Sequence, residues 1–296
     1  MMSKTQAILW HRVVFFTVMH MGTLLAVWVL ITRPVKLTTM VWCVGLWCMS
    51  GLSITAGAHR LWSHRSYKAH WLLRLVLMLW NCVALQSDLI SWSITHRCHH
   101  RWSETDADPH DSRRGFFYSH MGWILLDKNE AREKAERIVP AHDLWSDPLL
   151  LFQKRWYPML AITFAFALPT LLPCICGGEE PRYAFLICVC LRHTWMQHAT
   201  WTVNSLAHLY GTRPYNVAIE PRQNWMSTVF TLGEGWHNYH HTFPSDYRAS
   251  EFAWFINLTT AFIDGCAILG LVTNRNTAPQ HVIDRRKLGA VTNSSL

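Results

Sequence analysis

The sequence predicts an all-α integral membrane protein, with four transmembrane helices in two hairpins and a helical cap outside the bilayer. Half of the 296 residues are apolar and only 16% are charged, and the apolar residues form blocks as long as a bilayer is thick. Seventeen tryptophans and eighteen histidines exceed ordinary usage, and these residue types suit membrane interfaces and metal ions. We therefore expect a membrane metalloprotein with one domain over residues 1–296.

The first hairpin comes from the two N-terminal apolar blocks, at about 13–31 and 38–57. Each is close to the roughly 20 residues that a helix needs to cross the hydrocarbon core. The connection 32–37 is very short and contains the turn pair Arg33-Pro34, so we expect antiparallel neighbours. The first block lacks an A-x-A-like cleavage site and is too long for a signal-peptide core. It is therefore expected to remain as an anchor.

The second hairpin is predicted at about 159–176 and 183–204, joined by residues 177–182. Two further apolar stretches, 71–85 and 252–272, contain charged or amide side chains. A charge at the bilayer centre costs about 2.5–3.5 kcal/mol on insertion scales. We favour helices that lie at the interface or pack on the cap for these two stretches.

The basic residues set the predicted orientation. They are frequent in 58–158 and rare in the two hairpin turns, which by the positive-inside rule places this stretch and both termini in the cytosol. The cap then comprises about 58–158 and 205–280, followed by a flexible tail, 281–296. The net charge of +8 is dispersed among apolar segments, which favours an anionic membrane face or substrate over nucleic acid.

Three histidine clusters lie just beyond the apolar blocks. Two have the pattern HxxHH, in which the outer histidines share one face of a helix. The other is HxxxxH, whose five-residue interval requires a helix end or a distortion to converge. The clusters are His59 and His64; His96, His99 and His100; and His237, His240 and His241.

Counting the crossings gives a physical check on these clusters. All eight imidazoles lie on the cytosolic side, provided that 71–85 does not cross the membrane. Eight neutral imidazoles exceed what one ion uses, so two metals are the natural number. Imidazole alone does not select the metal, because zinc, copper, iron and nickel all accept it.

Four segments resemble the signature segments of the membrane acyl-CoA desaturases, the stearoyl-CoA desaturase family (fatty acid desaturase type 1). The resemblance runs from about residue 40 to 272 with the motifs in order. It implies an oxidoreductase with two iron ions (Fe2+) on the cytosolic face of the endoplasmic reticulum membrane. The segments are GAHRLWSH (57–64), HRCHHRWSETDADPH (96–110), NSLAHLYGTRPY (204–215) and GEGWHNYHHTFPSDYR (233–248).

The implied reaction inserts a cis double bond into a saturated long-chain fatty acyl-CoA, commonly at the ninth carbon. It uses dioxygen and electrons from cytochrome b5 and its reductase. The family's ninth histidine ligand matches His208, and its asparagine that reaches the metal through water matches Asn204. The nine histidines are thus the expected catalytic metal ligands.

The substrate also requires an apolar tunnel and a basic surface. By resemblance, Gln86, Trp92 and Thr200 shape the bend in the tunnel. Trp47 lies about 18 Å before His59 along an ideal helix and is expected to close the far end, although ordinary helix packing explains it as well. Lys128, Arg113 and Arg114 are candidates for the phosphates of coenzyme A, or form a solvated basic face.

Some positions depart from the family pattern. Ile94-Thr95 replaces a common Arg-Asp pair, Ser87 replaces a frequent asparagine, and Asp127 stands where a basic residue is usual. Positive charge expected near coenzyme A is therefore missing, which leaves the head-group contacts open.

Iron is assigned from the chemistry and the resemblance together. A mid-chain methylene has no acidic hydrogen, so general-base catalysis has nothing to act on and an oxidant is required. Zinc has no redox chemistry. Each ligating imidazole should donate its other N–H to a carboxylate or carbonyl, and the acids that flank the clusters are candidates, with His110 beside them. These acids are Glu104, Asp106, Asp108, Glu234 and Asp246.

Two alternatives remain open. A membrane di-iron lipid hydroxylase would use the same ligands to insert oxygen. A divalent-metal transporter or a haem-binding membrane protein is more distant, because transporters bind their ions near the bilayer midplane, whereas these clusters follow the crossings.

Overall fold

The first two helices form an antiparallel pair. In the computed structural model, which describes residues 6–294, α1 spans Trp10–Thr32 and α2 spans Leu37–Leu52. The π-helix η1, Ser53–Ser63, continues directly from α2. Glu179, from the other hairpin turn, accepts from the Lys36 backbone N–H at 2.9 Å and from the Thr39 hydroxyl at 2.8 Å. These bonds satisfy donors at the start of α2 and join the two turns at one end of the molecule.

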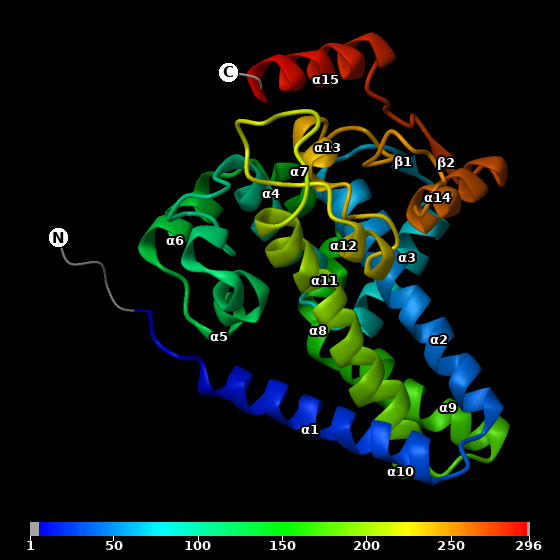
Figure 1. Ribbon diagram of the computed structural model, residues 1–296. Helices are drawn as coiled ribbons and strands as arrows, with labels where there is room; N and C mark the ends of the chain where they lie inside the picture. The colour runs from blue at the N-terminus through cyan, green and yellow to red at the C-terminus, as the bar shows by residue number, and fades with distance from the viewer. Residues whose placement is uncertain (1–5, 295–296) are drawn as a thin grey trace.

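The second helical hairpin consists of two long rods, and each rod is a run of consecutive shorter helices. One rod contains α8, Pro148–Ala161, then the π-helix η4, Ile162–Ala167, and α9, Leu168–Gly177. The other contains α10, Pro181–Ala184, the π-helix η5, Phe185–Leu191, and α11, Arg192–Leu209. Figure 1 shows these rods in the lower part of the view and the shorter helices above them.

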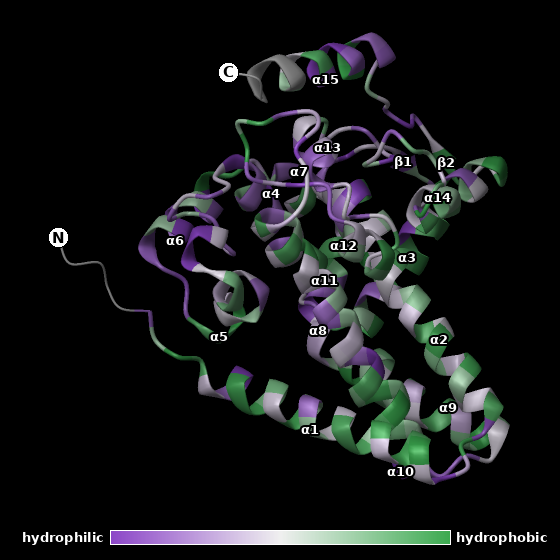
Figure 2. Cartoon of the chain, viewed as in Figure 1, coloured by the Kyte–Doolittle hydropathy of each residue, from purple (hydrophilic) through white to green (hydrophobic). Residues whose placement is uncertain are grey.

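Apolar surface is concentrated on the long rods. Figure 2 shows hydrophobic residues along α1, α2, α9 and α10, and hydrophilic residues in the upper part. Among the described residues, three rods are long and apolar enough to cross a membrane: Trp10–Thr32, Leu37–Ser63 and Pro148–Gly177. This supports a multi-pass membrane protein.

The fourth predicted span, 183–204, is helical but more polar than the others, because α11 carries Arg192, His193 and Gln197. Its crossing stays a prediction. The helices α3, Trp71–Ala84, and α4, Leu89–Arg101, pass the same length and composition test only as a pair bent by 83°. The number of candidate spans in the described chain is therefore three or four.

The largest core cluster lies where the rods meet the shorter helices. Leu77, Met78 and Ile90 from α3 and α4 are fully buried there, together with Leu150 of α8 and Ile263 of α14. α14 spans Leu258–Ile268. A two-stranded antiparallel sheet pairs β1, Lys68–Ala69, with β2, Val272–Thr273, and ties the segment after η1 to the end of α14.

The remaining helices are short, apart from α15. α15, Gln280–Ser294, appears at the top of Figure 1. The smaller elements are η2 (Ser112–Arg114), the π-helix η3 (Tyr118–Gly122), α5 (Trp123–Leu125), α6 (Glu130–Ile138), α7 (His142–Trp145), α12 (Trp225–Phe230) and α13 (His237–Thr242).

The C-terminal segment differs from the expected flexible tail. Residues 280–294 form α15, and Ile283 is fully buried in a cluster with Tyr215 and Tyr239. Lys287 Nζ lies 2.6 Å from Glu251 Oε2, which adds an ion pair to this apolar contact. The tail prediction is therefore corrected for these residues, while residues 295–296, like the N-terminal 1–5, lie outside the described part.

Candidate metal centre

The first histidine cluster converges because the helix that carries it is distorted. His59 lies within η1 and His64 follows it directly. The His64 backbone N–H bonds to the His59 carbonyl at 3.0 Å, a bond across five residues that is typical of a π-helix. This confirms the expectation that the five-residue interval needs a distortion.

The other histidines come from three helices. His96, His99 and His100 lie in the last two turns of α4, and His208 lies at the end of α11. His237, His240 and His241 belong to α13. Each HxxHH motif is helical, so its side chains point in a common direction, as the spacing predicts.

The structure brings all nine predicted histidines together in two groups. Within each group, one ring nitrogen per histidine lies within 4.8 Å of all the others. α4 and α13 contribute to both groups, which places the groups side by side. The first group is His59, His64, His96, His100 and His240, and the second is His99, His208, His237 and His241.

The ring nitrogens face one another at short distances. His64 and His96 approach at 2.8 Å and His59 and His240 at 2.9 Å, in each case between Nε2 atoms. In the second group, His237 Nε2 lies 3.0 Å from that of His208 and 3.1 Å from that of His241. Two nitrogens bound at about 2.1 Å to one ion, at a right angle, are about 3.0 Å apart. The donor set therefore fits one metal ion in each group.

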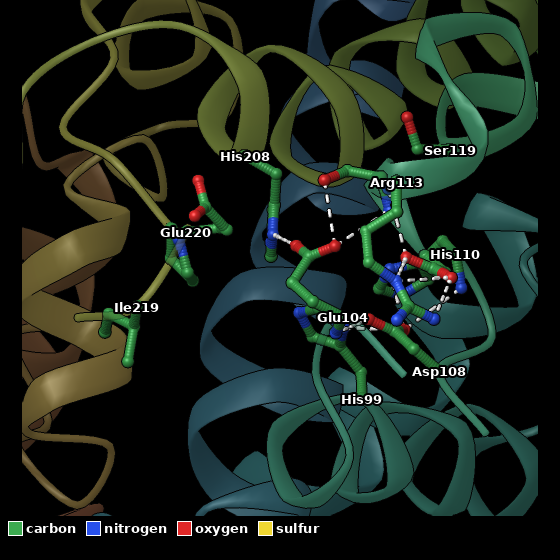
Figure 3. Close-up of polar contacts among 12 residues, drawn as sticks. His99, Glu104, Asp108, His110, Arg113, Ser119, His208, Ile219 and Glu220 are labelled. Atoms are coloured by element: carbon green, nitrogen blue, oxygen red, sulfur yellow. Dashed lines mark hydrogen bonds and ion pairs between the residues drawn. The ribbon is translucent and has the colours of Figure 1, made fainter. Parts of the chain in front are cut away.

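Carboxylates occupy the opposite side of three rings. His99 Nδ1 lies 2.9 Å from Asp108 Oδ1, and His208 Nδ1 lies 2.7 Å from Glu104 Oε1. Figure 3 shows Glu104 reaching across to His208, with Asp108 beside His99. His59 Nδ1 lies 2.8 Å from an oxygen of Glu234. In this arrangement Nδ1 carries the proton and Nε2 keeps its lone pair for a metal.

These contacts confirm that three of the five expected acids lie against histidines of the clusters. Asp106 instead has a side chain that is 89% exposed and pairs with Arg113. Asp246 accepts from the Tyr239 hydroxyl at 2.7 Å and pairs with Arg248. Asp246 therefore supports α13 through the residue between two of its histidines.

A buried arginine that sequence reasoning missed orients Glu234. Arg60 is 1% exposed and donates to Glu234 Oε1 from Nε and Nη2, at 3.1 and 2.8 Å. Its Nη1 also donates to the Tyr247 carbonyl at 2.8 Å and to the Thr260 hydroxyl at 2.9 Å. The position of Arg60 next to His59 was the one sign of its role in the sequence. Its partners Glu234 and Tyr247 lie more than 170 residues away, so no local pattern links them.

The electrostatics favour neutral imidazoles on α13 and an ionised Glu234. Burial and the neighbouring histidines hold the pKa values of His237, His240 and His241 well below the usual range. Burial alone raises the pKa of Glu234, but Arg60 and His59 outweigh it and lower the value to about 2. Neutral rings beside ionised carboxylates are the state that metal ligation requires.

His110 is the other buried histidine of this region. It forms a further group of potential ligands with His99 and Asp108. Its ring centroid lies 4.2 Å from that of His99, and its Nδ1 lies 3.7 Å from Asp108. His110 thus packs beside the second group, as expected.

A cavity of about 510 Å³ reaches the first group at His96. The predicted residues Gln86, Trp92, Thr200 and Lys128 line it. Gln86 Nε2 donates to the Thr200 hydroxyl at 2.9 Å, and the Trp92 ring stacks on that of His96 at 5.1 Å. The rest of the lining includes Phe15, Phe16, Leu85, Trp123 and Trp201.

A smaller cavity of about 50 Å³ adjoins the first and lies between η1 and α11. Both cavities are lined by Trp92, His96, Thr200 and Asn204, so Asn204 lies beside the site, and its contact with a metal through water stays a prediction. Trp47 does not line either cavity. Its ring packs edge-on against Trp195 at 6.2 Å, two helical turns before the cavity residue Ile54.

The basic residues at the wide cavity differ from those expected. Neither Arg113 nor Arg114 is among the lining residues. Arg113 pairs with Asp106 and Asp111, and Arg114 lies 3.5 Å over the Tyr118 ring. Arg12 and Arg132 line the cavity with Lys128 and were missed. Arg12 lies at the start of the first helix. A basic residue at that position of the sequence indicates an anchor at the membrane interface rather than a cavity residue.

Comparison with known proteins follows the same segments. Residues 37–253 match the model of the fatty acid desaturase family. The chain is 44% identical to stearoyl-CoA desaturase of Sus scrofa over 274 residues, which is 93% of this chain and 76% of that protein. It is 44% identical to Delta(9)-fatty-acid desaturase fat-7 of Caenorhabditis elegans, over 94% of this chain and 82% of the other. Stearoyl-CoA desaturase 5 of Bos taurus is 45% identical to the chain, over 95% of this chain and 84% of that protein.

Proposed function

The chain belongs to the fatty acid desaturase family, and from this we propose that it is an acyl-CoA desaturase. This oxidoreductase introduces a cis double bond at the ninth carbon of a saturated long-chain fatty acyl-CoA. The observation that carries the proposal is a cavity with aromatic walls that ends at His96, one of nine histidines gathered in two groups.

Two iron ions are the proposed cofactors. Each of the two histidine groups would hold one ion, and Asn204 would contribute through water. The bound iron, reduced and exposed to dioxygen, supplies the oxidising chemistry that an unactivated methylene requires. The number of donors supports this, because five histidines in the first group exceed the four ligands that are usual for zinc.

The side chains around the cavity bind and orient the acyl chain. Phe15, Phe16 and Trp201 exclude water from it, and the hydrogen-bonded pair of Gln86 and Thr200 fixes its bend. Trp92, stacked on His96, forms the wall of the cavity beside the first histidine group. A chain held in one bent conformation presents one carbon–carbon bond to the metals, which accounts for a single product.

The head group of the substrate is an anionic nucleotide. Lys128 from the loop after α5, together with Arg12 and Arg132, lines the wide cavity and supplies positive charge for its phosphates. Asp127 and Thr95 line the same cavity at positions where the family usually has basic or acidic residues. Arg113 and Arg114 have other partners and are assigned no contact with the head group.

The reaction balances with one dioxygen, two electrons and two protons. The acyl chain loses two hydrogens and two water molecules form. Cytochrome b5 and its reductase are the proposed electron donors at the cytosolic face of the endoplasmic reticulum. The orientation is supported by the excess of basic residues in 58–158 over the hairpin turns.

Expression in a desaturase-deficient yeast tests the proposal. We expect unsaturated fatty acids with the double bond at the ninth carbon, together with iron in the purified protein. Products heavier by one oxygen would instead identify a hydroxylase. Zinc uptake into vesicles, or a haem spectrum, without unsaturated product would identify the more distant class. Full iron loading without any change in the acyl chains would contradict the proposed activity.

A further inference from the structure

Arg192 is a buried cation at the start of α11, and within the described chain no carboxylate accepts from it. Only 2% of the surface of Arg192 is exposed. Its hydrogen bonds go to neutral acceptors, namely three backbone carbonyls and the Ser50 hydroxyl. A charge at membrane depth is costly, and such residues are retained where they have a specific task.

The three carbonyls lie where the helical hydrogen-bond ladder is interrupted. Cys188 belongs to η5 and Ala165 to η4, and both are π-helices that free backbone groups. Val83 lies in the last turn of α3, where carbonyls lack partners within the helix. Its oxygen accepts from Arg192 Nη1 at 2.7 Å, the shortest of these bonds.

The break between α3 and α4 is held from two sides. From α11, Gln197 Nε2 adds a bond to the Leu85 carbonyl at 3.3 Å, next to the contact of Arg192 with Val83. From α8, Gln153 Oε1 accepts from the Leu89 backbone N–H at 2.8 Å. The 83° bend between the two helices therefore depends on side chains of α8 and α11.

The same break forms one wall of the wide cavity. Leu85, Gln86 and Ser87 line it, and α4 continues from there to His96. Leu85 and Ser87 have φ values of 56° and 76°, in the left-handed region that non-glycine residues avoid. A backbone in this conformation persists only when its surroundings hold it. The direction of α4 fixes how far the bend of the cavity lies from the histidine groups.

We infer that Arg192 is a positioning residue that selects the carbon at which the double bond forms. It acts through the α3–α4 break: it holds the Val83 carbonyl and thereby sets the distance between the bend of the cavity and His96. This inference rests on the proposed desaturation, and it adds a determinant of bond position that does not touch the substrate.

Replacement of Arg192 tests the inference in microsomes given saturated acyl-CoA of one chain length. In Arg192→Met, the double bonds should spread to neighbouring carbons, and kcat/KM should fall at least about tenfold. Arg192→Lys keeps the charge and reaches fewer acceptors, so its product distribution should be intermediate. Arg182→Met is the matched control, because Arg182 lies in the same rod, is exposed and pairs with Glu180. Its products should match the wild type.

Gln153→Leu gives a second test if Arg192→Met is not recovered folded. Gln153 holds the same break from α8 and is fully buried, so its loss should spread the bond positions in the same way. An unchanged bond position in both variants, with activity lost only in proportion to folded protein, would overturn the inference. Absence of unsaturated product from the wild type would overturn the proposed function instead.

Discussion

Asp108 shows how much of the candidate metal centre depends on residues outside the two histidine groups. Its side chain is almost fully buried and accepts from His99 Nδ1 and from the backbone N–H groups of Glu104 and His110. Burial raises its pKa, but the adjacent His99 outweighs this and keeps the carboxyl ionised. One carboxylate therefore orients a ring and fixes the loop after α4.

Asp108→Asn is expected to weaken metal binding in the second group by about 10- to 100-fold, because the amide no longer fixes the tautomer of His99. Iron per protein, measured by elemental analysis after dialysis against a weak chelator, reports the effect. Asp106→Asn is the matched control, since Asp106 is 89% exposed two residues away. Equal iron loss in both variants would contradict the role of Asp108.

Trp47 is the residue for which sequence reasoning expected control of chain length. Trp47→Ala should allow longer acyl chains if the chain continues from the narrow cavity along α2, because the Trp47 ring packs on Trp195 two turns beyond the cavity residue Ile54 and would then limit its length. Competition between acyl-CoA substrates of different length measures this preference. Trp28→Ala removes a ring that is 53% exposed on α1 and should leave the preference unchanged. An unaltered profile in Trp47→Ala would indicate ordinary helix packing.

At the scale of elements, α15 supports the histidine helix α13 from outside. Ile283 of α15 packs on Tyr215 and Tyr239, and Tyr239 lies between His237 and His240. The Tyr239 hydroxyl bonds to Asp246, which also accepts from the Ala278 backbone N–H before α15. The position of α13 thus depends on a segment that looked like a tail.

Ile283→Ala should destabilise this contact by about 2–5 kcal/mol, the usual cost of emptying a buried aliphatic site. Thermal unfolding in detergent, followed together with metal release, measures the loss. Leu288→Ala provides the control on the same helix, because Leu288 is 70% exposed. If Ile283→Ala unfolds and releases metal as the wild type does, α15 does not support α13.

A chain of three histidines joins α1 to α11 and η3. His20 Nε2 lies 2.9 Å from His198 Nε2, and His198 Nδ1 lies 2.9 Å from His120 Nε2. His20 Nδ1 must donate to the Phe16 carbonyl, which fixes the proton positions along the chain. These bonds hold α1, with its cavity residues Phe15 and Phe16, against α11.

His198→Phe should therefore loosen α1, since the ring remains but both hydrogen bonds are lost. Limited proteolysis near residue 10 and a lower midpoint of thermal unfolding are the expected results. His11→Phe changes an exposed histidine on the same helix and should behave as the wild type. Equal protease resistance in both variants would exclude a role for the histidine chain in holding α1.

For the whole molecule, the distribution of charge controls the approach of an anionic substrate. The chain carries a net charge of +8, and Arg12, Lys128 and Arg132 line the wide cavity. Glu136 pairs with both Lys128 and Arg132, and Asp127 adds a negative charge at the same wall. The local field is therefore weaker than the basic residues alone suggest.

Asp127→Asn should lower KM for acyl-CoA several-fold at low salt, with kcat unchanged, because it removes a charge that repels phosphate. The difference should shrink as ionic strength rises and screening increases. Glu130→Gln changes an exposed acid three residues further on and controls for net charge. A KM that is the same for Asp127→Asn and wild type at low salt would contradict a head-group site at this wall.

The apolar blocks, the HxxHH motifs, their common side of the membrane and the need for a distortion at His59 could be predicted from the sequence alone. These follow from periodicity and spacing, which are local properties of the chain. The sequence also indicated Glu104, Asp108 and Glu234 as acids near the clusters, because they flank the motifs. It did not indicate α15 as a helix that packs on the site.

Contacts between distant segments set how the histidines divide into two groups and which residues hold the site together. Arg60 meets Glu234 across 174 residues, and Arg192 meets Val83 across 109. Such contacts form where distant helices happen to expose unpaired backbone or carboxylate groups, and no short pattern records them. The break at 85–88 has the same cause, since its left-handed residues are stable only between α8 and α11.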